Sequence, residues 1–131
     1  MGLLNIKEVG VPKSTDQLKA MEPFEFQNYV ISFMQGINNP KLTGEGGIDG
    51  WTVFKRHPIQ VKQQEHVGRP EIQKFQSAIH AEKKDKGYFF AFSFTKPAYE
   101  EVARCKLEEN IDIQLWQVQG LMTAEPPPDF L

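Results

Sequence analysis

The sequence predicts an α/β domain in which a mixed β-sheet is flanked by helices on both faces. Apolar residues alternate with polar ones over residues 59–62 and 111–116, as they do in strands. Residues 88–94 are apolar on both faces, which is typical of a central buried strand. The segments between them repeat apolar residues at helical spacing. The order is helix, two strands, helix, strand, helix, strand, and a hairpin followed by βαβ units forms a mixed sheet.

Helical spacing predicts a first helix over about residues 23–35. Phe26, Val30 and Phe33 recur on one face, Pro23 is acceptable in the first turn, and Gly36 follows the end. Asn38-Asn39-Pro40 is then expected to form a loop.

Two further helices are expected. Gly68-Arg69-Pro70 begins the second, and residues 83–87 end it. Thr95 is placed to cap the third. The side of that helix expected to face the core carries Ala98, Val102, Ala103 and Leu107.

A hairpin is expected between the first two helices. Residues 51–54 form its first strand, residues 55–58 its turn and residues 59–62 its second strand. Residues 111–116 form the last strand.

The 131 residues fit one domain, and 40% of them are hydrophobic, which excludes a largely disordered chain. We divide the chain into a lead-in segment (residues 1–20), the α/β domain (21–119) and a flexible Pro-rich tail (120–131). Cys105 is the single cysteine, so an internal disulfide is excluded and a reducing cytoplasm is the expected location. No apolar stretch is long enough to span a membrane.

Charge is distributed unevenly along a chain whose net charge is −2. Residues 51–106 carry eleven Lys or Arg against six acids, a balance of +5, while residues 107–131 have a balance of −5. Solvated helix faces and a real anion-facing surface both explain this pattern equally well.

Three polar side chains come together in the predicted hairpin. Asp49 lies in the turn-forming run Gly46-Gly47-Ile48-Asp49-Gly50, at the start of the first strand. Gln60 and Lys62 are two residues apart and therefore share one face of the second strand. A hard divalent cation takes oxygen ligands, which Asp49, the Gln60 side chain and the Val61 carbonyl can supply. Lys62 can orient a water or neutralise developing charge, so the set suits phosphodiester hydrolysis.

Each half of this pattern has a plain structural explanation. A Gly-Gly-x-Asp-Gly run is often only a turn, and a Gln-x-Lys strand is often only a solvated face. Their combination after one helix, and before a helix and a buried strand, is far more specific.

From about Met21 to about Trp116 the sequence resembles the Mrr-like branch of the PD-(D/E)xK restriction endonucleases, in which Gln replaces the middle carboxylate. The matching motifs are these: Pro23-Phe24-Glu25-Phe26-Gln27, Gly47-Ile48-Asp49-Gly50, Gln60-Val61-Lys62, Lys86-Gly87-Tyr88-Phe89 and Phe94-Thr95-Lys96-Pro97-Ala98. The resemblance implies a restriction-endonuclease-like fold with Asp49, Gln60 and Lys62 as the catalytic set and Mg²⁺ or Mn²⁺ as cofactor. The family usually has a Glu in its first helix. Gln27 occupies that position here, and Glu25 is the other candidate, about 200° around the helix.

A closer resemblance, over Pro23–Gln27 and Gly47–Trp51, is to the nuclease-like C-terminal segment of some bacterial site-specific DNA methyltransferases. It implies that the methyltransferase portion of a longer polypeptide is a partner.

Five further residues are candidates for DNA contact. Lys55, Arg56 and Arg69 could bind the DNA backbone without reading its sequence. Thr95 and Lys96 could bind a phosphate at a helix N-terminus, although a simple N-cap explains them equally well.

The leading functional hypothesis is a magnesium-dependent DNA endonuclease domain associated with a DNA methyltransferase of a restriction–modification system. The alternative is a catalytically weak or inactive DNA-binding or target-positioning domain on the same fold. Cleavage of RNA or branched DNA on this scaffold stays open. Cleavage of both strands usually needs two sites, so a homodimer is a further possibility.

Overall fold

The computed structural model describes residues 12–40 and 47–123. Within them lies a five-stranded sheet with the order β1-β2-β3-β4-β5. The strands are β1 (Ile37–Asn38), β2 (Gly50–Trp51), β3 (Pro58–Val61), β4 (Lys86–Ala91) and β5 (Asp112–Gln117). β1, β2 and β3 pair antiparallel, whereas β3, β4 and β5 pair parallel. The predicted hairpin and the mixed sheet are therefore confirmed.

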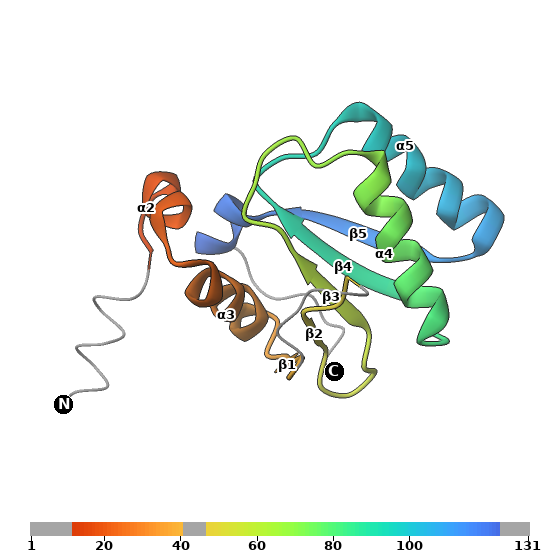
Figure 1. Ribbon diagram of the computed structural model, residues 1–131, viewed down its shortest axis with the longest axis horizontal. Coiled ribbons are helices and arrows are strands. Elements are labelled where there is room, and N and C mark those ends of the chain that lie inside the picture. Colours follow the sequence, from red (N-terminus) through yellow and green to blue (C-terminus); the bar gives the residue numbers. More distant parts are fainter. Residues whose placement is uncertain (1–11, 41–46, 124–131) are drawn as a thin grey trace.

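Helices cover both faces of this sheet, as predicted (Figure 1). α2 (Thr15–Ala20) and α3 (Pro23–Phe33) lie toward one face, and α4 (Arg69–Ala81) and α5 (Lys96–Arg104) cover the other. α5 continues into a π-helical turn over Cys105–Glu109, and a 3-10 helix over Val118–Met122 follows β5. In the described ranges, no helix combines the length and the apolar character needed to cross a membrane.

The central strand β4 supplies both halves of the core. Tyr88 and Phe90 pack in the cluster that contains α3, while Phe89 and Ala91 pack against α4 and α5. All four side chains are buried, as the two-sided apolar pattern predicts. The strand is therefore a rigid base beside which β3 is held in parallel register.

The first strand of the hairpin is shorter than predicted. Pairing ends at Trp51, and Val53 and Phe54 lie exposed in the turn. The apolar run over 51–54 suggested a longer strand, but Thr52 is buried and its backbone N–H donates to the His57 carbonyl, which closes the turn early.

β1 was not predicted, because its residues fall in and beside the expected loop at Asn38. The strand forms through contacts distant in sequence. A Cβ at Gly50 would lie only 2.6 Å from the Ile37 carbonyl oxygen, so the glycine lets β1 and β2 approach closely.

The core side of α5 also differs from the prediction. Ala98 is buried and Val102 is half-buried, but Ala103 and Leu107 are exposed. Glu101 and Cys105 take the inward positions instead. Glu101 can be buried because the Arg104 guanidinium donates to its carboxylate at 2.6 and 3.0 Å.

Packing continues beyond the predicted domain limits at both ends. Leu18, in the expected lead-in, is fully buried in α2, whose N-cap is Ser14. Leu121, in the expected tail, is buried in the same core cluster. Residues 1–11 and 124–131, and the Gly44–Gly46 part of the glycine-rich turn, lie outside the described residues.

Candidate active site

Backbone hydrogen bonds fix Asp49 at the entrance to β2. Its N–H donates to the Ile59 carbonyl at 2.8 Å, and its carbonyl accepts from the Asn39 N–H at 2.8 Å. Its carboxylate Oδ2 accepts the Val61 N–H at 2.7 Å. Asp49 is therefore held against β3 by backbone and side chain together, and its carboxylate lies beside the Gln60-Val61-Lys62 segment.

Burial raises the pKa of the Asp49 carboxyl, because a charged carboxylate is poorly solvated in this position. The Val61 N–H and the positive charge of Lys62 act in the opposite direction and offset part of that effect. A carboxylate in this state gains from a cation placed close to it.

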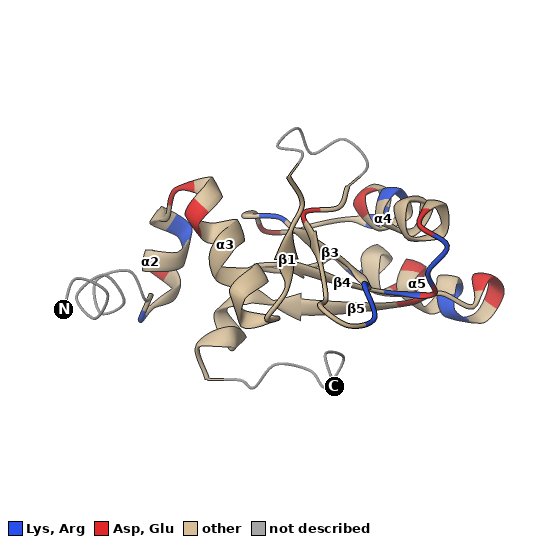
Figure 2. Cartoon of the chain, turned by 90° about the horizontal axis from the view of Figure 1, so that it is seen from below, with Lys and Arg blue, Asp and Glu red and all other residues tan. Residues whose placement is uncertain are grey.

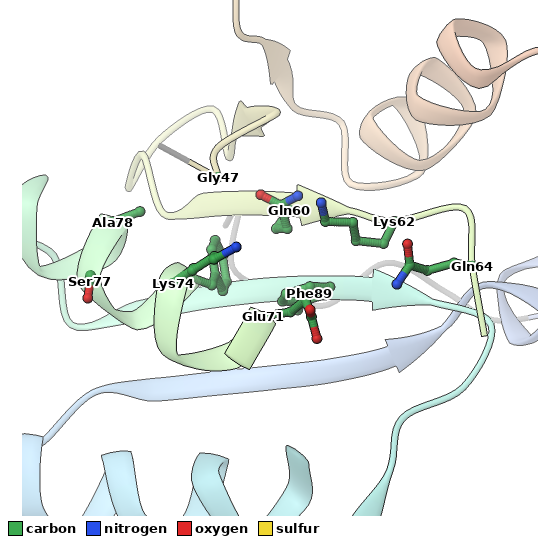
Figure 3. Close-up of a pocket in the computed structure, with 10 residues that line it drawn as sticks. Gly47, Gln60, Lys62, Gln64, Glu71, Lys74, Ser77, Ala78 and Phe89 are labelled. Atoms are coloured by element: carbon green, nitrogen blue, oxygen red, sulfur yellow. The ribbon is translucent and has the colours of Figure 1, made fainter. Parts of the chain in front are cut away.

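Gln60 and Lys62 point from β3 toward α4, on one face of the strand, as predicted (Figure 3). Gln60 is only 6% exposed, and its Oε1 has no hydrogen-bond partner among the described residues. Gly47 has a φ of 69°, and a Cβ there would lie 3.2 Å from this oxygen. Gly47 thus passes close to this buried acceptor without placing a side chain over it.

The Val61 carbonyl faces the side on which Asp49 lies. The Lys62 N–H donates to the Phe90 carbonyl at 2.8 Å, toward β4. Backbone groups of neighbouring strand residues point in opposite directions, so Val61 presents its N–H and C=O toward β2. All three proposed oxygen ligands therefore come from the β2 side of β3 or from its α4 face.

These groups fit a hard divalent cation. In the described part of the chain, no cluster of three or more His, Cys, Asp or Glu side chains could hold a metal ion. The available set is instead one carboxylate with a raised pKa, one buried amide oxygen without a donor, and one carbonyl. These are oxygen ligands of the kind that Mg²⁺ and Mn²⁺ take, but they carry a single negative charge.

A pocket of about 630 Å³ opens between β3 and α4 beside these residues (Figure 3). Its polar lining comprises Gln60, Lys62 and Gln64 from β3 and the segment after it, and Glu71, Lys74 and Ser77 from α4. Phe75 and Phe89, each 1% exposed, also line it. Gln64, Glu71, Lys74 and Ser77 were not among the predicted site residues. Residues 71, 74 and 78 share a helical stripe, but the sequence alone did not show that this stripe faces β3.

The first helix presents Gln27 and Glu25 differently. Gln27 is one turn before Ile31, whose side chain packs near Gly36 and Gly50 at the β1–β2 edge. The Gln63 amide, directly after Lys62, donates to the Leu18 and Met21 carbonyls at 3.1 and 2.9 Å, which fixes the start of α3 near the end of β3. Gln27 is half-buried, whereas Glu25 is exposed.

The candidate DNA-contacting residues lie at two opposite ends of the sheet. Lys55 and Arg56 are exposed in the β2–β3 turn. Pro58, which follows this turn, and Lys62 are four residues apart, or about 13 Å along a strand. Arg69, Thr95 and Lys96 lie near the other end, where Val67 and Phe94 form an isolated parallel bridge.

Two of these five residues already have side-chain contacts within the protein. The Thr95 hydroxyl accepts the Ala98 N–H at 3.3 Å, which is an N-cap. Arg69 pairs with Glu100 at 3.2 Å.

The hairpin is also tied to the C-terminal end of α4. The Trp51 indole N–H donates to the Glu82 carboxylate at 3.2 Å, and the Lys84 ammonium donates to the Lys55 carbonyl at 3.0 Å. These two contacts bind the hairpin to the α4 layer, which helps to hold Asp49 in place.

The positive balance of residues 51–106 does not form a uniform basic face. Lys or Arg and Asp or Glu alternate along both α4 and α5 (Figure 2). Arg104, for example, contacts Glu101, Glu108 and Glu109. Much of the positive charge is therefore balanced locally, and Lys62 and Lys74 form no ion pair within the described ranges.

Comparison with known proteins gives one family. The family model described as restriction endonuclease, the Mrr catalytic domain, matches residues 18–124. No curated protein and no solved structure was found to match the chain.

Proposed function

The chain belongs to the Mrr-type restriction endonuclease family, and from this we propose that it is a Mg²⁺- or Mn²⁺-dependent DNA endonuclease domain. The observation that carries the proposal is the buried Gln60 Oε1, which lacks a partner in the described residues. Gln60 shares a strand face with Lys62, and the Asp49 carboxylate accepts the N–H of Val61 between them. A buried acceptor without a donor costs about 1–3 kcal/mol, and a cation bound at Gln60 Oε1 would offset that cost.

Asp49, Gln60 Oε1 and the Val61 carbonyl would hold the metal ion. The half-buried Gln27 is a better candidate to support it than the exposed Glu25. When bound, the ion supplies a water of lowered pKa and polarises the phosphate. Hydrolysis would join a water oxygen to phosphorus, break one bridging P–O bond and transfer a proton of that water to the departing sugar oxygen. The Lys62 ammonium donates hydrogen bonds to the oxygens on which negative charge develops.

Duplex DNA can reach both ends of the sheet from this site. The separation of about 13 Å between Pro58 and Lys62 equals about four base steps of 3.4 Å. Lys55 and Arg56 at one end, and Arg69, Thr95 and Lys96 at the other, are therefore proposed to contact backbone phosphates on either side of the cut.

The test is cleavage of supercoiled and linear DNA with Mg²⁺ or Mn²⁺. We expect nicking by wild type, and a loss of about 10²–10³-fold in rate for Lys62→Ala, because one charge-stabilising donor is removed. Lys83→Ala is the matched control, since Lys83 is an exposed lysine beyond the end of α4 that does not line the pocket. Wild type that cuts no substrate with either metal, or a Lys62→Ala protein as active as the control, contradicts the proposal.

A second candidate function is DNA binding or target positioning without efficient cleavage. It is favoured by the single negative charge of the ligand set, since Gln27 and Gln60 are both neutral. The same assay with a binding measurement separates the two functions, because this candidate predicts wild-type DNA binding without cleavage. RNA and branched DNA are included as substrates, since the site geometry does not favour one of them.

We also propose that the domain acts with a DNA methyltransferase of a restriction–modification system and pairs with a second copy to cut both strands. The support is the resemblance over Pro23–Gln27 and Gly47–Trp51 and the single site per chain. Co-purification with the methyltransferase encoded beside or in the same gene, and the mass of the DNA-bound species, test these two points.

A further inference from the structure

The pocket beside the proposed cleavage site has a second lysine that the catalytic set does not use. Lys74 lies on α4, across the pocket from β3, and its side chain extends toward Gln60 (Figure 3). It is exposed and forms no ion pair with any described residue. Its acidic neighbour Glu71 is engaged elsewhere, because Oε1 of Glu71 accepts the backbone N–H of the N-cap residue Gly68 at 3.0 Å.

Position 74 is fixed relative to β3 by the packing of α4. Ile72, Phe75 and Ile79 on the same helix are at most 1% exposed, and they pack with Phe89 of β4 in one core cluster. A phosphate held between the two lysines would therefore have a defined place relative to Asp49.

The charges of the site favour an anion once a metal ion is bound. Lys62 and Lys74 balance Asp49 and Glu71, so these four side chains have a formal charge of zero, and a divalent cation raises it to +2. Without Lys74, the site with a bound divalent cation would have a formal charge of only +1. The extra charge comes from α4, on the wall of the pocket opposite β3.

The size and lining of the pocket fit one nucleotide. Its volume of about 630 Å³ lies within the range of about 300–1,000 Å³ for small-ligand sites. Gln64 and Ser77 offer polar groups at the rim, and both are exposed. Phe75 and Phe89 are too deeply buried to stack on a base, so the recognisable group is the phosphate and not the base.

We propose that this pocket is a subsite for the nucleotide next to the scissile phosphate, and that Lys74 neutralises the phosphate of that nucleotide. The proposal rests on the proposed function. Lys74 binds the substrate strand and sets its register over Asp49 and Lys62, and it does not take part in the chemical step.

The first measurement is the salt dependence of binding to a labelled DNA duplex by fluorescence anisotropy. Ca²⁺, a hard cation that takes oxygen ligands, replaces Mg²⁺ at the metal position, and affinities are read from duplex that a gel shows to be uncut. Lys74→Gln should weaken binding by about tenfold, as expected for one charged contact. The slope of log K against log[salt] should become shallower by about 0.9, the value for one phosphate contact. Lys83→Gln is the control of equal charge loss and should keep the wild-type slope, while Lys74→Arg should restore most of the affinity.

The second measurement locates the phosphate. Single phosphates of the duplex are replaced in turn by neutral methylphosphonates, and each duplex is bound to wild type and to Lys74→Gln. At one position, next to the cut, the replacement should weaken wild type but leave Lys74→Gln almost unchanged. If wild type cleaves DNA but Lys74→Gln binds it with the affinity and salt slope of Lys83→Gln, the subsite is overturned and hydrolysis stands. The same conclusion follows if every methylphosphonate weakens Lys74→Gln as much as it weakens wild type. If wild type never cleaves DNA but its binding depends on Lys74, the proposed hydrolysis is overturned and the phosphate contact stands.

Discussion

Replacement of Asp49 by Asn or by Ala separates two roles of its carboxylate, binding a metal ion and accepting a strand N–H. Both variants lack the negative charge. Only Asn keeps an oxygen where Oδ2 accepts the Val61 N–H at 2.7 Å. Ala at this position would remove the hydrogen-bond acceptor of the Val61 N–H on β3.

The magnitude follows from this one bond. An N–H left without a partner in a half-buried position costs about 1–3 kcal/mol. In a domain of 131 residues, 1 kcal/mol corresponds to roughly 3–5 °C in Tm. Asp49→Ala should therefore melt roughly 3–15 °C below Asp49→Asn in EDTA, by circular dichroism.

The pH dependence has a definite sign. The pKa of Asp49 is raised above 3.8 in the folded state, so the folded protein binds the proton more tightly than the unfolded chain does. The stability that Asp49 contributes is fully present below pH 3.8 and is lost as pH rises through the raised pKa. Metal-free Asp49→Asn should consequently be at least as stable as wild type at pH 7, and this advantage should shrink toward pH 4.

Magnesium provides the second comparison. For a site with a Kd of about 1 mM, 10 mM Mg²⁺ stabilises wild type by about 1.4 kcal/mol, and neither variant should gain this. Equal melting temperatures for the Ala and Asn variants would refute the role assigned to the Val61 hydrogen bond. Equal magnesium stabilisation of wild type and Asp49→Asn would refute Asp49 as a ligand.

Three other substitutions test separate parts of the site. Gln60→Glu should tighten magnesium binding at least roughly tenfold, as measured by calorimetry. One added negative charge at contact distance from the ion is worth more than about 1.4 kcal/mol even when screened. An unchanged affinity would mean that Gln60 is not a ligand. Lys62→Ala should lose cleavage yet bind magnesium as well as wild type or better, since a repelling cation is removed, and weaker binding in the same titration would argue against this. Gly50→Ala places a Cβ 2.6 Å from the Ile37 carbonyl oxygen and 2.8 Å from Ile31 Cδ1. Urea unfolding should therefore show a free energy of unfolding lowered by about 1–3 kcal/mol. An unfolding midpoint equal to that of wild type would mean that β1 can move away.

Strand periodicity explains why part of the site was visible in the sequence. A strand fixes its side chains at a period of two, so Gln60 and Lys62 had to share a face once residues 59–62 were recognised as a strand. Thr95 and Pro23 mark helix starts through local chemistry that needs no tertiary contact. These features are confirmed because they depend on neighbours in the chain.

Other features depend on contacts between distant segments. β1 forms because Gly50 lets the Ile37 carbonyl come close, and two residues are too few to give a pattern. Hydropathy placed Leu107 in the core, but the structure buries Glu101 instead, because its carboxylate pairs with Arg104. Lys74 could be assigned to a helix, yet its position across the pocket follows only from the parallel crossover between β3 and β4.

The two tryptophans of the chain lie in separate environments, which gives the molecule two independent optical reporters. Trp51 follows Asp49 by two residues on β2 and is tethered to Glu82 through its indole N–H. Trp116 lies on β5, with its ring 6.0 Å from that of Phe90. Emission from a Trp116→Phe protein would thus report on the hairpin alone, and emission from Trp51→Phe on global unfolding. Occupation of the metal position could be followed by intrinsic fluorescence, without a label and without waiting for a cleaved product.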